Sequence, residues 1–183
     1  MKKACIILTD GFEELEMVGA YDILKRGGVA VDIYALSGTQ ATGKCGLTCA
    51  QLRPVADLTD TAAATYDALV LAGGPQYEAL KNSARVKELI LYFFRADKVL
   101  AAICASPTIF GEMGLLKGKN YTCFTAMNAD FGGRFTNAYA TTDGNTVTGK
   151  SAAAAIDFGL AVLEKLCGAD TAEKVKKSIY YQI

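Results

Sequence analysis

One short stretch places a reactive residue type between a strand and a helix. Val99 to Ile103 is an apolar run of the kind that forms a fully buried parallel strand. The run ends on Cys104, and Ser106 and Pro107 then supply an N-cap residue and a proline for the first helical position. The sequence therefore predicts a tight elbow between strand and helix, with the Cys104 thiol at the helix N-terminus.

This placement suits a nucleophile. Unpaired N–H groups and the helix dipole stabilise an anion at a helix N-terminus, which lowers the pKa of a cysteine there. The alternative is that Cys104 is a small buried hydrophobe, as free cysteines often are. We favour the nucleophile, because open α/β sheets bind their ligands at the carboxyl ends of their strands.

A pair of glycines follows another predicted buried strand, Ala68 to Ala72. Gly73 and Gly74 allow the backbone to approach a ligand closely and to present N–H groups to it. An ordinary turn is the alternative reading. We expect the two glycines to lie beside Cys104, and this position favours their use as an oxyanion hole over an ordinary turn.

Three carboxylates crowd the first turns of a predicted helix that Gly27 and Gly28 end. We interpret Glu13 and Glu14 as charges that suit the helix N-terminus. Glu16 lies between two apolar residues and has two open readings, a third such charge or an inward-pointing carboxyl group near Cys104.

The composition of the chain limits the classes of function that it can have. The chain has 183 residues, 51% of them hydrophobic, with 19 basic and 19 acidic side chains. We expect one globular domain over residues 1–183, and the balanced charge argues against nucleic acid or an anionic membrane as partner. The beginning of the chain has too short an apolar run for a signal peptide, so we expect a cytoplasmic protein.

Cysteine is common in the chain and histidine is absent. Six scattered cysteines in a chain without a signal peptide indicate reduced thiols rather than disulfides. The lack of histidine removes Ser-His-Asp and Cys-His catalysis and argues against zinc. We predict no metal and no cofactor.

The elements that must position these residues alternate between strands and helices, which predicts an α/β fold with a three-layer, mostly parallel sheet. Polar and apolar residues alternate in 38–52, which suggests a small hairpin holding two partly exposed cysteines, Cys45 and Cys49. We expect a polar connection over 57–65, a loop over 128–137 and a helix over 152–166 capped by Ser151. Further strands are expected over 3–9, 29–35, 118–124, 139–142 and 146–149, and further helices over 85–96, 108–113 and 171–177.

Several motifs together resemble the ThiJ/PfpI superfamily, and within it the DJ-one-like branch. The resemblance runs essentially the whole length of the chain, and its motifs are Asp10–Glu16, Tyr66–Val70, Leu71–Gly74 and Ala102–Pro107. It implies a flavodoxin-like fold, a homodimer and a nucleophilic Cys104 partnered by a protonated Glu16. It also implies that backbone N–H groups of Gly74 and Ala105 line the pocket. The apolar positions Met17, Ala20 and Ile23 agree with a helix that is buried on more than one side, as a dimer would require.

The implied pair of Cys104 and Glu16 makes physical sense. Two anions repel in one desolvated pocket, so a thiolate favours a neutral carboxyl group, which can donate a charge-assisted hydrogen bond to the sulfur. The chain also departs from the family. Cys123 stands where several members have histidine, and we place it and Ser106 as candidate pocket residues. A family Gly-Pro-Gly loop is replaced by Gly149–Ala152.

The resemblance leaves three functions open. The first is cysteine-dependent glyoxalase or deglycase activity on methylglyoxal or its protein adducts, with Glu16 or water as proton shuttle. The second is oxidative-stress sensing or a chaperone role through oxidation of Cys104 to a sulfinate. The third is thiazole monophosphate biosynthesis, an old family label for which the sequence offers no phosphate loop. Peptidase activity is disfavoured by the lack of histidine.

Overall fold

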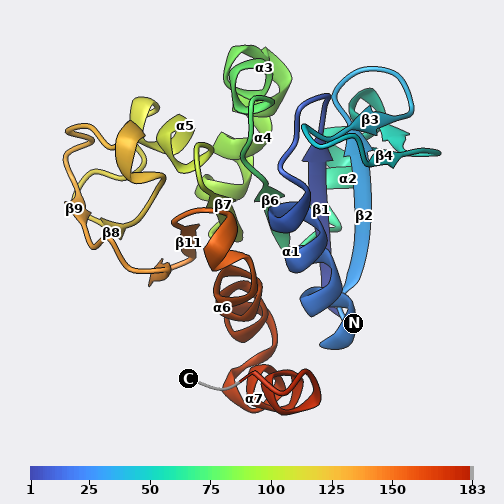
Figure 1. Cartoon of the computed structure of the whole chain (residues 1–183). Coiled ribbons are helices and arrows are strands. Elements are labelled where there is room, and N and C mark those ends of the chain that lie inside the picture. Colours follow the sequence, from blue (N-terminus) through green and yellow to red (C-terminus); the bar gives the residue numbers. More distant parts are fainter. Residues whose placement is uncertain (182–183) are drawn as a thin grey trace.

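The computed structural model describes residues 1–181 and is built on a seven-stranded sheet (Figure 1). The β10–β11 pair is antiparallel and every other pair of neighbours in this sheet is parallel. In spatial order the strands are β10 (Ala140–Asp143), β11 (Thr146–Gly149), β7 (Val99–Ile103), β6 (Ala68–Leu71), β1 (Lys3–Leu8), β2 (Ala30–Ala35) and β5 (Arg53–Pro54).

Helices cover both faces of the sheet. One face carries α1 (Glu14–Arg26) and α6 (Ala155–Cys167), with α7 (Ala169–Ser178) packed on α6. The other face carries α2 (Asp60–Ala64), α3 (Tyr77–Asn82), α4 (Ala84–Arg95) and α5 (Pro107–Glu112). The predicted flavodoxin-like, three-layer fold is confirmed.

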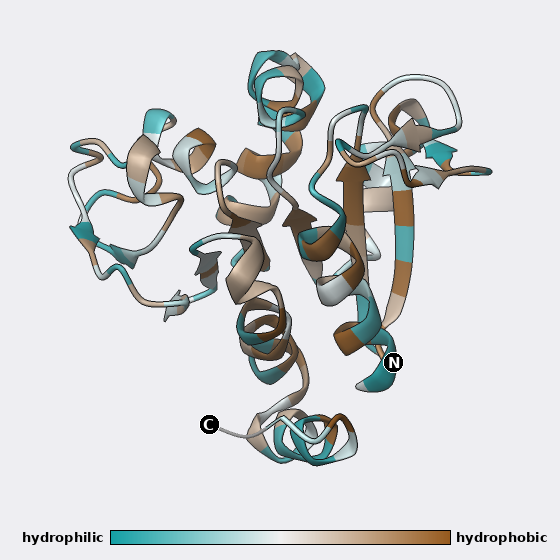
Figure 2. Ribbon diagram, in the orientation of Figure 1, coloured by the Kyte–Doolittle hydropathy of each residue, from teal (hydrophilic) through white to brown (hydrophobic). Residues whose placement is uncertain are grey.

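The central strands are apolar on both faces, because each face is buried under helices. In β1, Ile6 belongs to the core beneath α1 and α6, whereas Ile7 belongs to the core beneath α4. Figure 2 shows the same concentration of hydrophobic residues in the middle strands. Burial on two faces explains why these strands read as continuous apolar runs rather than as alternating ones.

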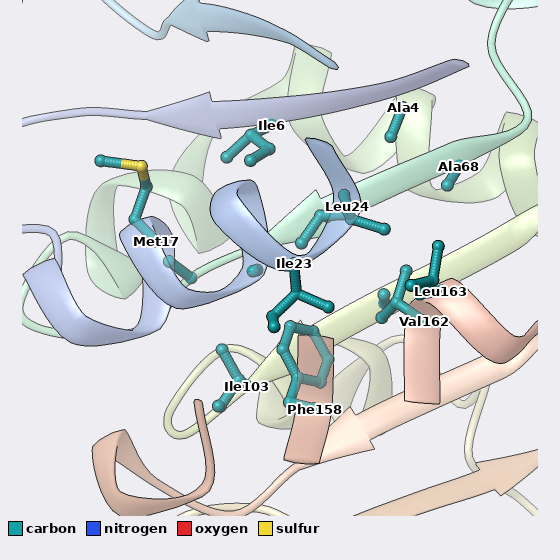
Figure 3. Packing of buried hydrophobic residues seen from close by; sticks show 14 of the residues in the cluster. Ala4, Ile6, Met17, Ile23, Leu24, Ala68, Ile103, Phe158, Val162 and Leu163 are labelled. Carbon is teal, nitrogen blue, oxygen red and sulfur yellow. The ribbon is translucent and has the colours of Figure 1, made fainter. Parts of the chain in front are cut away.

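Helix α1 differs from the prediction in the direction of its apolar residues. Met17, Ala20 and Ile23 are buried inside the chain's own core, where Ile23 lies beside Phe158 of α6 (Figure 3). The interpretation of these three residues as an extra apolar side is therefore wrong. The large apolar side chains that α1 exposes are Leu15 and Val18.

Smaller elements lie outside the main sheet. The hairpin predicted over 38–52 is confirmed as β3 (Ala41–Thr42) and β4 (Thr48–Cys49). The loop predicted over 128–137 is interrupted by β9 (Arg134–Phe135), which pairs with β8 (Asn120–Tyr121) in a separate two-stranded sheet. Residues 1–181 also contain three short 3₁₀ helices, η1 (Val55–Asp57), η2 (Thr125–Met127) and η3 (Ala152–Ala154).

Two local predictions are wrong. The connection predicted over 57–65 contains α2, whose N-cap hydroxyl, that of Thr59, accepts a hydrogen bond from the Ala62 N–H. Ser151 does not cap α6, because η3 intervenes and the Ser151 side chain makes no capping hydrogen bond. Within the described residues, none of the helices has the length and apolar character needed to cross a membrane.

Candidate active site

Cys104 follows the last residue of β7 and leaves the sheet in an uncommon backbone conformation. Its φ is +66°, in the left-handed region that residues other than glycine seldom adopt. The backbone is held on both sides, because the Cys104 N–H donates to the Gly149 carbonyl at 2.9 Å and its own carbonyl accepts from the Phe124 N–H at 2.7 Å. The chain therefore forms a fixed elbow that turns the Cys104 side chain away from the strand ladder.

The Glu16 side chain points inward. It is fully buried, and its Oε2 accepts a hydrogen bond from the Gly73 N–H at 2.7 Å. Its Oε1 has no hydrogen-bond partner among residues 1–181. Of the two readings that the sequence leaves open, the structure shows the inward-pointing carboxyl group.

Gly73 explains how Glu16 and Cys104 fit together. A Cβ at this position would lie 2.7 Å from the Cys104 Cβ and 2.8 Å from the Glu16 Oε2. Both side chains thus occupy the space that the missing side chain leaves. The next residue, Gly74, has a φ of +84°, and a Cβ there would lie 2.5 Å from the Gly11 carbonyl oxygen.

The two acidic groups influence one another electrostatically. Burial raises the pKa of Glu16 to about 7, against the opposing effect of the hydrogen bond from the Gly73 N–H. Burial and then the Glu16 carboxylate raise the pKa of Cys104 to about 12, opposed by the backbone N–H groups of Ala105 and Gly74. The predicted lowering of the thiol pKa is therefore not found beside a charged Glu16.

The physical reason is that the pair tolerates one negative charge and not two. Helix α5 spans only Pro107–Glu112, so few peptide dipoles add to the field at the elbow. With the proton on Glu16, the repulsion disappears and the carboxyl group becomes a donor for the sulfur. The position of this one proton decides whether the thiolate forms.

A cavity of about 380 Å³ opens over the pair. Its charged lining residues are Glu13, Glu16 and Lys44, and Lys44 Nζ lies 2.5 Å from Glu13 Oε2. The other lining residues are Gly74, Pro75, Tyr77, Cys104, Ala105, Phe124, Met127, Ser151, Ala152 and Ala153. The lining of the cavity therefore combines three charged side chains with a larger set of apolar and aromatic ones.

Three of the predicted pocket residues do not line this cavity. The Ser106 hydroxyl donates to the Ala72 carbonyl at 2.7 Å, beneath the elbow. Cys123 is fully buried, and burial raises the pKa of its thiol to about 11. The Gly73 N–H is occupied by Glu16, which leaves the N–H groups of Gly74 and Ala105 as donors near the sulfur.

Comparison with known proteins identifies the family. The DJ-1/PfpI family matches residues 2–165 of the chain. The chain belongs to the DJ-1/PfpI family. It is 31% identical to protein dj-1beta of Drosophila melanogaster over 97% of this chain and 96% of that protein.

Other relatives of this DJ-1/PfpI chain agree in sequence and in fold. It is 28% identical to the Caenorhabditis elegans protein DJR-1.2, named a glutathione-independent glyoxalase, over 97% of this chain and 96% of the relative. The crystal structure of Drosophila melanogaster DJ-1beta superposes with a TM-score of 0.90 at 27% identity, covering 100% of this chain and 99% of that one.

The sequence reading missed some residues of the cavity in this DJ-1/PfpI chain. Glu13 stands at the N-cap of α1, as its interpretation as an N-terminal charge requires, but its side chain makes no capping hydrogen bond and is paired with Lys44 in the cavity. Glu14 lies in the first turn of α1 as expected, but its Oε1 accepts from the Cys45 N–H at 2.6 Å. The only signal for Phe124 in the sequence is an aromatic residue at the end of the predicted strand 118–124, directly after Cys123.

Proposed function

We propose that this chain is a cysteine-dependent enzyme of the glyoxalase or deglycase type. Its substrate is methylglyoxal, or the adduct that methylglyoxal forms with a protein. The observation that carries the proposal is the conjunction of Cys104 on its elbow with a buried Glu16 whose Oε1 has no partner among the described residues. The C. elegans relative named a glyoxalase supports it, at 28% identity.

The first step is attack of the Cys104 thiolate on the aldehyde carbon. A C–S bond forms, and the π electrons of the carbonyl move to its oxygen. The N–H groups of Gly74 and Ala105 face the sulfur from the adjacent backbone and stabilise the developing oxyanion. Protonated Glu16 gives its proton to this oxygen, which yields a neutral hemithioacetal.

Glu16 then moves the remaining protons, because the chain has no histidine to do so. As a carboxylate it removes the proton from the former aldehyde carbon, and the electrons move to the ketone oxygen to give an enediolate. The hydroxyl proton on the former aldehyde oxygen then passes to the ketone oxygen, and Glu16 returns its proton to the neighbouring carbon. The resulting thioester of lactate is hydrolysed by water, which releases lactate and restores the thiol. A pKa of about 7 suits a group that both accepts and donates at neutral pH.

Lactate production from methylglyoxal without glutathione tests the proposal. The wild-type protein should form lactate at a rate proportional to its concentration, and Cys104→Ala should be the blank. Cys123→Ala serves as the matched control, since this thiol is buried outside the cavity. No lactate above the Cys104→Ala blank would refute the enzyme.

A second candidate function is sensing of oxidants at Cys104. The observation that favours it is the pair of N–H donors beside the sulfur, which suit the oxygens of a sulfinate. Each hydrogen peroxide would transfer one oxygen atom to sulfur and leave as water. Mass spectrometry after limiting peroxide should find two added oxygens on Cys104 before any other cysteine is modified.

We also propose a homodimer formed through α1. Leu15 is 63% exposed and Val18 43% exposed, and they border an apolar hollow with Ala152, Ala153 and Ile156. A second copy would remove this surface from water. Light scattering should give the mass of two chains, and Leu15→Glu should halve it. A wild-type mass of one chain at micromolar concentration would refute the dimer.

A further inference from the structure

The cavity over Cys104, with a volume of about 380 Å³, is much larger than methylglyoxal requires. Besides Ala105, its apolar or aromatic side chains are those of Pro75, Tyr77, Phe124, Met127, Ala152 and Ala153. Cavities of about 300–1,000 Å³ typically hold drug-sized ligands. A three-carbon aldehyde would leave most of this wall in contact with water.

Phe124 is the most informative residue of this wall. It is 43% exposed although it is a large apolar side chain, so covering it would remove apolar surface from water. Its backbone N–H donates to the carbonyl of Cys104 at 2.7 Å. The aromatic ring is therefore carried by a residue whose backbone is tied directly to the nucleophile.

The segment behind Phe124 is also held in place. The Met127 N–H donates to the Phe124 carbonyl at 2.8 Å, and the Tyr121 hydroxyl donates to Asn128 Oδ1 at 2.7 Å. Tyr121 itself is buried. A wall anchored in this way is formed before a ligand arrives, which lowers the entropic cost of binding.

We propose that the site selects 2-oxoaldehydes whose ketone carbon carries an aryl or branched alkyl group. The inference rests on the proposed function and names its substrate class. The aldehyde carbon must lie at Cys104 and its oxygen at the N–H groups of Gly74 and Ala105. The substituent on the ketone then packs against the apolar part of the lining, which includes Phe124 and Met127 of the segment tied to Cys104.

Turnover of two aldehydes is the first test. Phenylglyoxal, which gives mandelate, should be used with a kcat/KM at least about ten-fold above that of methylglyoxal, the discrimination typical of an apolar pocket. Phe124→Ala and Met127→Ala should each lower this preference, with Phe124→Ala reducing it about ten-fold. Tyr139→Ala is the matched control, because Tyr139 is an exposed aromatic residue that does not line the cavity.

Alkylation of Cys104 tests the same wall without turnover. The thiolate displaces bromide from phenacyl bromide or from bromoacetone, forming a C–S bond, and mass spectrometry locates the adduct. Each rate is divided by the rate of the same reagent with glutathione, which removes the intrinsic difference in reactivity. The corrected rates should favour phenacyl bromide about ten-fold, and Phe124→Ala should abolish that preference.

The two readouts separate failure of this inference from failure of the proposed function. If neither aldehyde is turned over but the aryl reagent is still preferred at Cys104, the selectivity of the site for aryl groups is supported and the proposed enzyme activity is refuted. Corrected alkylation rates within two-fold of each other in the wild type would overturn the inference. Loss of both reagents' reactivity to the same degree in Phe124→Ala and in Met127→Ala would also overturn it.

Discussion

Cys5 and Cys104 belong to two strands of the same parallel sheet, yet only one is placed for chemistry. Cys5 lies in the middle of β1, fully buried, with its thiol against the Ala68 carbonyl at 3.4 Å. Cys104 lies one residue beyond β7, half-buried, at the wall of a cavity. Burial raises the pKa of both thiols.

The difference comes from the end of the strand ladder. In the middle of a strand, N–H groups are used by neighbouring strands, so none is free to stabilise an anion. At the carboxyl end the chain leaves the sheet, and the N–H groups of Gly74 and Ala105 face the sulfur. Two identical side chains therefore differ in their expected reactivity because one lies within a strand and the other lies just beyond the end of one.

Replacing the two cysteines should give the largest contrast. Cys104→Ala should lower lactate formation at least about a thousand-fold, as loss of a nucleophile commonly does. Cys5→Ala should leave this rate unchanged. Limiting iodoacetamide followed by mass spectrometry should label Cys104 before any other cysteine. Faster labelling of the exposed Cys45 would contradict the prediction that the elbow makes Cys104 the most reactive thiol.

The dependence of stability on pH should report the shared proton of Glu16 and Cys104. The pKa of Glu16 rises from 4.5 to about 7 on folding, so the folded protein binds more protons between these values. Its stabilising contribution is full below the unfolded pKa and is lost as the pH rises through about 7. The loss should reach about 3 kcal/mol.

Urea unfolding at pH 4.5 and pH 7.5 measures this effect, at values that bracket the titration of Glu16. Glu16→Gln should lose most of the pH dependence, whereas Cys5→Ala should retain it. Equal pH dependence in the wild type and in Glu16→Gln would show that Glu16 is not the group responsible.

Shortening the Glu16 side chain should weaken its support of the thiolate. Glu16→Asp withdraws the donor, and loss of a charge-assisted hydrogen bond costs about 1.5–3 kcal/mol. The thiol pKa should rise by about one to two units, and alkylation at neutral pH should slow accordingly. Glu16→Gln keeps a donor and should retain more reactivity.

Thiolate absorbance followed against pH distinguishes the three proteins. If the wild type, Glu16→Asp and Glu16→Gln give coincident curves, Glu16 does not act on the sulfur. The same titration on Cys104→Ala supplies the background from the other thiols.

Cys5→Ala should have the smallest effect. It removes one sulfur atom from the core and should lower the free energy of unfolding by about 1 kcal/mol, close to the loss of one buried methylene group. Urea unfolding at a single pH measures it. A loss of reactivity at Cys104 in this variant would mean that the two positions are coupled through the sheet.

The sequence by itself determined the layers of the fold and the elbow residue. Continuous apolar runs such as Val99–Ile103 require burial on two faces, and that requirement fixes a parallel sheet between helices. Proline after Cys104 marks the start of a helix. These signals are local in the chain, so they can be read without the fold.

Only the tertiary structure decided where the side chains of Glu13, Glu16, Ser106 and Cys123 point. Glu13 at the N-cap of α1 and Glu16 in its first turn are three residues apart, yet Glu13 pairs with Lys44 and Glu16 accepts from the Gly73 N–H. Helical spacing cannot distinguish them, because their partners come from segments distant in the chain. The pKa of Cys104 could not be predicted from the sequence either, because it depends on burial and on one proton shared with Glu16.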